Sequence, residues 1–175
     1  MSSKTRKNVK RYQKINEADE IISKIIKHFD DQFWNITQPQ IVVVAILNKP
    51  PTRKNWIARI RQIHGIFKYL VNSSNTPLKE CNYVIEIYMD DWTKLNTAQR
   101  EWVLFHEMLH IVDPKTARFF THDVQEFSPI YDAVGHGYCN NAELKSLFDK
   151  DVKPTGVFLI QRMLTINELN EKDKE

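Results

Sequence analysis

The sequence is poor in cysteine and has no long apolar stretch. Its two cysteines, Cys81 and Cys139, lie far apart and form no C-x-x-C pair. This excludes a disulfide framework and a zinc site built from thiolates, and two ordinary thiols fit a reducing compartment. The longest apolar run, residues 41–47, is far below the ~20 residues of a membrane span, and the N-terminus has no apolar signal-peptide core. We therefore expect no membrane association and a cytoplasmic location.

Charge is nearly balanced over the whole chain but not along its length. The formal net charge is +3, which by itself neither demands nor excludes a polyanionic partner. Residues 1–14 hold six lysine and arginine residues and no acidic residue, which predicts a basic flexible arm capable of weak nucleic-acid contact. One catalytic domain is expected over 15–138, followed by an extension with a charged tail over 139–175.

Hydrophobic periodicity predicts a helix and two strands in the first half of the chain. Apolar residues at three- and four-residue steps predict a helix over 16–29. The β-branched run 41–47 predicts a strand buried on both faces, and the alternation over 83–89 predicts a half-buried strand. Residues 57–71 fit both a helix and a strand, and we favour a strand there although Gly65 interrupts it.

Three further helices are predicted in the second half, which makes the fold class α+β. Asn96 or Thr97 can cap the first of them, and Pro114 prevents much continuation beyond its end. Gly135 is a natural end for the second. The three predicted helices cover residues 96–112, 121–135 and 141–150.

The first of these helices carries a motif with chemical meaning. Residues 106–110 read His-Glu-Met-Leu-His, which is H-E-x-x-H. A four-residue step places both imidazoles on one helix face, able to bind one zinc ion, with Glu107 beside them. The helix is apolar nearly all round and is therefore expected to be buried, where unpartnered polar side chains are costly. A metal explains these residues more economically than a core helix with ordinary hydrogen bonds does.

A catalytic zinc ion takes three protein ligands and a water, so a third ligand must lie elsewhere in the chain. The spacing H-E-x-x-H-x-x-G-x-x-H is excluded, because position 113 is Asp and position 116 is Thr. His122 ranks first because the loop before it is long enough to fold the chain back, and Glu126 ranks second. The weaker candidates are Asp113, Asp123 and His136.

The segment from Trp92 to Ile111, followed by His122-Asp-Val-Gln-Glu-Phe127 and Gly135, resembles the putative phage metallopeptidase family. More distantly it is similar to the SprT-like zinc proteases, which pair H-E-x-x-H with a downstream H-G-x-x-F. In that pattern the second-part histidine is the third zinc ligand, and it falls on His122 here. Asp123 stands where SprT-like proteins usually have glycine. The resemblance covers roughly residues 40–138. It implies that the location is the host cytoplasm if the protein is viral.

The resemblance implies a small zincin-like metallopeptidase fold. A short mixed sheet would pack on the active-site H-E-x-x-H helix and on a second, ligand-bearing helix. An edge strand would align an extended substrate, and residues 83–89 are the candidate for that strand. Residues 40–48 and 57–63 would supply the rest of the sheet.

The expected function is hydrolysis of peptide bonds in a protein or peptide substrate by a water molecule that Zn2+ activates. Glu107 would be the general base, and the ligands would be His106, His110 and His122. A first alternative is a non-enzymatic zinc-stabilised adaptor for nucleic acid or protein, in which a glutamate between two histidines would be idle. A second is a SprT-like protease that acts on DNA-bound proteins through the basic arm. The sequence specifies no oligomeric state.

Overall fold

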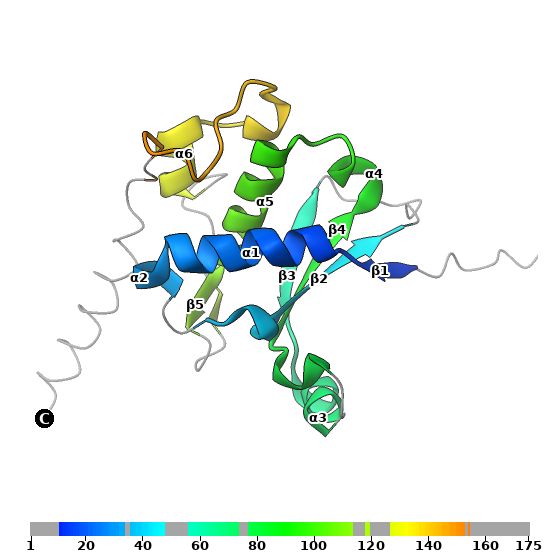
Figure 1. Cartoon of the computed structure of the whole chain (residues 1–175). Coiled ribbons are helices and arrows are strands. Elements are labelled where there is room, and N and C mark those ends of the chain that lie inside the picture. Colours follow the sequence, from blue (N-terminus) through cyan, green and yellow to red (C-terminus); the bar gives the residue numbers. More distant parts are fainter. Residues whose placement is uncertain are drawn as a thin grey trace, which may run out of the picture.

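A four-stranded sheet and two helices that pack on one of its faces form the centre of the protein. The computed structural model describes residues 11–33, 36–47, 56–73, 77–113, 118–119, 127–152 and 154. Figure 1 shows helix α1 lying across the strands with α5 beside it. This mixed sheet with several helices confirms the α+β class. Within the described ranges, no helix is long and apolar enough to cross a bilayer.

The sheet has the strand order β1-β2-β4-β3. Its strands are Tyr12–Lys14 (β1), Ile41–Ile46 (β2), Ala58–Gln62 (β3) and Tyr83–Tyr88 (β4). The central strands β2 and β4 are parallel, while β1 and β3 pair antiparallel at the edges. Since β4 has a neighbour on both sides, the prediction that residues 83–89 form an edge strand is wrong. Alternation reports which side chains are buried, but the number of neighbouring strands depends on pairing between distant segments.

One segment that fitted both helix and strand contains one of each. Strand β3 ends at Gln62, and helix α3 covers Gly65–Ser73, starting at Gly65 with a positive φ of 55°. No residue of α3 is buried, and its single lysine, Lys68, donates to the main-chain oxygen of Cys81 at 3.0 Å. The 3-10 helix η2, Pro77–Glu80, then leads to β4.

The start of the chain's described part belongs to the sheet. Strand β1 lies within the segment 1–14 that was expected to be a flexible arm, and the Ile15 N–H donates to the Val43 carbonyl at 3.3 Å. The predicted first helix is confirmed as α1, Asn16–His28. A short helix α2, Asp30–Phe33, and the 3-10 helix η1, Gln38–Gln40, connect it to β2.

Helix α5, Thr97–Leu109, is the predicted H-E-x-x-H helix and follows the short helix α4, Met89–Trp92. Asn96 caps it, because its side chain accepts from the Gln99 N–H at 2.9 Å. The helix ends at Leu109, and not at residue 112 as predicted. The chain continues as strand β5, Ile111–Asp113, which pairs with β6, Arg118–Phe119. Two β-branched residues, at 111 and 112, suit that pairing better than a further helical turn.

Helix α6, Ser128–Val134, starts later than the predicted residues 121–123. Phe127 is its N-cap in extended conformation, with ψ 134°, and Pro129 occupies the first turn, where its missing N–H costs nothing. Gly135 ends the helix with a φ of 72°, as predicted. The predicted start of this helix lies outside the described residues.

The predicted helix over 141–150 is wrong. After the 3-10 helix η3, Tyr138–Asn140, the chain makes successive turns. The Asn141 side chain accepts from the Glu143 N–H at 3.0 Å, and the Ser146 hydroxyl accepts from the Phe148 N–H at 3.2 Å. Such local side-chain bonds compete with helical ones and favour turns.

Polar residues of α5 hold this turn region in place. The Gln99 amide donates to the carbonyls of Cys139 and Asn141, at 2.8 and 3.1 Å. The buried Glu101 carboxylate accepts from the Leu147 N–H at 3.0 Å and from the Ser146 hydroxyl at 2.5 Å. Leu144 and Leu147 join the main core.

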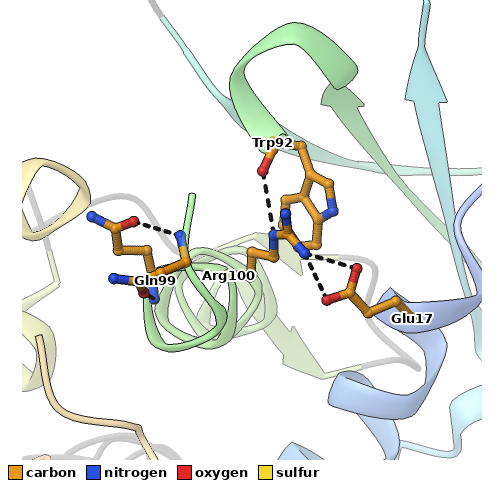
Figure 2. A network of polar contacts seen from close by, with 5 residues as sticks. Glu17, Trp92, Gln99 and Arg100 are labelled. Carbon is orange, nitrogen blue, oxygen red and sulfur yellow. Dashed lines mark hydrogen bonds and ion pairs between the residues drawn. The ribbon is translucent and has the colours of Figure 1, made fainter. Parts of the chain in front are cut away.

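Arg100 of α5 links this helix to α1 and to the end of α4 (Figure 2). Its guanidinium group donates to both Glu17 carboxylate oxygens on α1, at 2.8 and 3.0 Å. It also donates to the Trp92 carbonyl at the end of α4, at 3.3 Å. The helix is therefore anchored at its N-terminal half by three separate segments.

The buried Glu86 links strands across the face of the sheet that points away from the core. Its carboxylate accepts from the Arg59 Nε at 2.5 Å and from the Tyr12 hydroxyl at 3.2 Å, and its Oε2 lies 3.2 Å from the Arg61 Nε. Glu86 thus connects β4 to both edge strands, β1 and β3. Burial, followed by the negative charge of Glu86, raises the pKa of the Tyr12 hydroxyl.

The substitution Glu86→Gln is expected to reduce the free energy of unfolding by about 1–2 kcal/mol, because it removes a buried charge that accepts hydrogen bonds from partly exposed arginines. Denaturant unfolding followed by circular dichroism measures the loss. Glu17→Gln is the matched control, since Glu17 also pairs with an arginine but is 45% exposed. Equal losses in the two variants would contradict a special role for Glu86.

Candidate metal centre

The H-E-x-x-H residues lie at the end of α5. His106 and Glu107 belong to its last turn, and His110 is its C-cap. The two imidazole rings face one another with centroids 5.3 Å apart, and both histidines are half-buried. Glu107 is only 5% exposed. The structure therefore brings together three of the four predicted site residues.

Phe127 packs against both histidines. Its ring centroid lies 5.4 Å from that of His106 and 4.8 Å from that of His110, and its side chain is 6% exposed. Since Phe127 precedes α6 directly, this contact fixes the start of α6 beside the end of α5. Phe127 is also the last residue of the segment 122–127, which carries the second part of the family resemblance.

The Glu107 carboxylate points towards the edge strand β3. Its Oε2 accepts a hydrogen bond from the Ile60 N–H at 2.7 Å. Ile57 and Ile63 make main-chain hydrogen bonds to the β4 side, with Tyr88 and Asn82. Because main-chain groups alternate in direction along an antiparallel strand, those of Ile60 point to the outer edge of the sheet. The glutamate therefore lies at the outer edge of β3, the last strand of the sheet.

The other predicted metal ligands are not part of this arrangement as far as the structure describes it. His136 is exposed and its ring contacts Tyr131, at a centroid distance of 4.9 Å. Within the described ranges, no group of three or more His, Cys, Asp or Glu side chains is placed to hold a metal ion. His122, Asp123 and Glu126 lie outside those ranges, as does the side chain of Asp113. The third ligand therefore stays a prediction.

The residues present fit a metal ion of the kind that imidazole binds. Two imidazoles on adjacent turns of one helix can share one ion, and imidazole suits zinc and other first-row metals better than magnesium or calcium. Neither Cys81 nor Cys139 forms a disulfide within the described residues, and the buried Cys81 sulfur donates a hydrogen bond to the Tyr83 carbonyl at 3.2 Å. Neither cysteine belongs to a cluster of ligands within the described residues.

Sequence reasoning missed the hydrogen bond between Ile60 and Glu107. The two residues are separated by 47 positions, and a main-chain donor leaves no mark in the sequence. Only the alternation of β3 could have indicated that Ile60 lies on the core side, and that segment also fitted a helix. The contact of Phe127 with the histidine pair, by contrast, had a signal in the second part of the motif.

A histidine pair with an adjacent glutamate on one helix is the H-E-x-x-H pattern that occurs in metallopeptidases. The chain matches the family described as putative phage metallopeptidase over residues 10–151, and it belongs to that family, as predicted. No curated protein and no solved structure matches the chain. Membership of this family implies a metal ion. The matched range includes β1 and the turn region that packs on α5.

The substitution Glu107→Ala removes the carboxylate that accepts the Ile60 N–H. Because a charge-assisted hydrogen bond is lost, the rate of hydrogen exchange at the Ile60 amide is expected to increase by about 10- to 100-fold. Exchange measured residue by residue by NMR tests this. The Ile63 amide, which donates to the Asn82 carbonyl at 2.8 Å, is the internal control. A uniform increase at both amides would indicate general loosening of β3 instead.

Proposed function

We propose that this protein is a zinc-dependent peptidase with a zincin-like arrangement of sheet and helix. His106, His110 and His122 would hold the Zn2+ ion, and Glu107 would be the general base. One observation carries the proposal: the glutamate beside the histidine pair is buried against the outward-facing edge of a strand. A carboxylate with only a structural role would not need the two imidazoles next to it.

The assignment of His122 rests on ligand chemistry and on chain length. Phe127 lies against the histidine pair, and His122 precedes it by five residues in the sequence. Five residues span at most about 17 Å when extended, so this segment can reach the pair. Histidine is also the commoner ligand of catalytic zinc, which ranks it above Glu126.

Zinc bound at this site would supply a Lewis acid that polarises the substrate carbonyl and lowers the pKa of water. Glu107 would take the proton from the attacking water and transfer it to the leaving amine. Burial by the core keeps bulk water from the carboxylate, and the Ile60 N–H orients it. The histidine rings are in turn oriented by Phe127.

The substrate would lie along β3. This strand takes the role that the sequence suggested for residues 83–89, because β3 is at the edge of the sheet and contacts α5. Ala58 and Gln62 share the outward direction of Ile60, so their main-chain groups can pair with an extended peptide. Such pairing would bring a peptide bond close to Glu107.

The metal assignment is tested by elemental analysis of the purified protein. One zinc per chain is expected for the wild type, with much less in the variants His106→Ala, His110→Ala and His122→Ala. His136→Ala is the matched control, because His136 is exposed and far less suited to the site. Retention of zinc in His122→Ala with loss in Glu126→Ala would move the third ligand to Glu126.

The catalytic assignment is tested with Glu107→Gln, which preserves the shape of the side chain but cannot accept the proton. Peptide hydrolysis should fall by about 10²-fold or more while the zinc content stays at the wild-type level. Thermal melting checks that the variant is folded. Unchanged peptide hydrolysis in Glu107→Gln would contradict the role of Glu107 as the base. A wild-type protein that binds zinc but cleaves no peptide in a broad substrate screen would favour the non-enzymatic adaptor.

A further inference from the structure

Basic residues are concentrated in two short stretches of the chain. Residues 1–14 hold six lysine and arginine residues and residues 48–61 hold five, and neither stretch contains an acidic residue. The other 147 residues hold 14 basic and 22 acidic side chains. The small net charge therefore conceals a strong separation of charge along the sequence.

The topology brings the described parts of both stretches, which start at Arg11 and at Trp56, to the same end of the sheet. Strand β1 begins where β2 ends, since Tyr12 lies opposite Ile46 and the Leu47 N–H donates to the Arg11 carbonyl at 3.0 Å. At the same end, Ile46 lies beside Tyr88 of β4. The Tyr88 N–H donates to the Ile57 carbonyl, just before β3, at 3.0 Å. In Figure 1 this end lies on the right, where the chain enters β1.

Two arginines of β3 lie on the face of the sheet that points away from α1 and α5. Arg59 lies opposite Glu86 and Arg61 opposite Val84, whereas Ala58, Ile85 and Ile87 belong to the core on the other face. Arg61 is 57% exposed and Arg59 is 29% exposed. We call the group Tyr12, Trp56, Arg59 and Arg61 the basic sheet face.

Aromatic side chains lie among these arginines. The Arg59 guanidinium lies 4.4 Å from the centroid of the Trp56 ring, and Trp56 in turn stacks on Tyr88 at 4.3 Å. Tyr12, from β1, is 52% exposed and its hydroxyl is hydrogen bonded to Glu86. Stacking and the bonds to Glu86 hold the guanidinium groups in place before any ligand arrives.

Acidic groups nearby reduce the positive charge of this face but do not cancel it. Glu86 accepts from both arginines and is the acidic residue of the strands on this face. Asp90 and Asp91 follow β4 at the same end, and Asp91 pairs with Lys94 at 3.5 Å. Two guanidinium groups share one carboxylate, so the basic sheet face keeps a net positive charge.

We propose that the basic sheet face binds nucleic acid, with Arg59 and Arg61 contacting phosphates and Tyr12 contacting bases or sugars. Planar guanidinium groups recognise phosphate in two-point contacts. An exposed aromatic ring on the same sheet face as basic groups is the kind of platform on which single-stranded bases stack. This function is independent of the peptidase activity, because the face lies on the other side of the sheet from Glu107.

The experiment measures binding of the full chain to a fluorescent single-stranded DNA of about 16 nucleotides, the upper site size for one such platform. Fluorescence anisotropy is recorded between about 50 and 200 mM salt, where phosphate contacts have their largest effect. Arg61→Gln retains a hydrogen-bond donor for Glu86 but removes the charge. It should weaken binding about threefold or more and reduce the salt slope of log K by about 0.7, the value for one phosphate contact on a single strand.

Lys24→Gln is the matched control, with the same charge change on an exposed residue of α1. It should bind as the wild type does, and Arg61→Lys should restore most of the affinity. A deletion of residues 2–10 separates the arm from the sheet face and, unlike a deletion of 1–14, leaves β1 intact. In that deletion, Arg61→Gln should still reduce affinity.

Three results would overturn the proposal. The first is a wild type that does not bind DNA at about 50 mM salt. The second is an Arg61→Gln variant that binds as tightly as Lys24→Gln while both melt at the wild-type temperature, which would assign any binding to the arm alone. The third is displacement of the DNA by anionic phospholipid vesicles at equal charge, which would indicate a membrane surface instead.

Discussion

The structure depends on hydrogen bonds that main-chain N–H groups donate to two buried carboxylates. Helix α5 lies in the core and carries two of them, Glu101 and Glu107, each about 5–6% exposed. A buried carboxylate without partners is costly by several kcal/mol, and each of these finds a main-chain N–H in a distant segment. Glu101 holds Leu147 of the turn region, and Glu107 holds Ile60 of the edge strand. The same helix therefore organises the C-terminal packing and the candidate metal centre.

The sheet has a different chemistry on each of its faces. One face is apolar and packs on α1 and α5, which positions the edge strand β3 against Glu107. On the opposite face, Glu86 gathers Tyr12, Arg59 and Arg61 from the two edge strands. Strand β3 takes part in both, because alternate residues point to opposite faces. A short strand at an edge thereby supports the proposed peptide site with its main chain and the proposed nucleic-acid site with its side chains.

Sequence patterns predicted elements whose signals are local. The helix over 16–29, the cap at Asn96 and the end of α6 at Gly135 depend on neighbouring residues, and the structure confirms them. Three predictions proved wrong. Strand β4 is central and not at the edge, α5 ends before Ile111 and not at residue 112, and residues 141–150 form turns and not a helix. In each case distant contacts or side-chain bonds to the main chain outweighed the local pattern.

By itself, the sequence determined the family, the α+β class and the H-E-x-x-H residues. The histidine pair is encoded locally, because a four-residue step on a helix places His106 and His110 together without help from the rest of the chain. Only the tertiary structure decided which strand lies at the sheet edge, that the Ile60 N–H faces Glu107, and that Tyr12 shares a sheet face with the arginines of β3. Those features join residues far apart in the sequence, and their energies come from pairing and burial that no local pattern encodes.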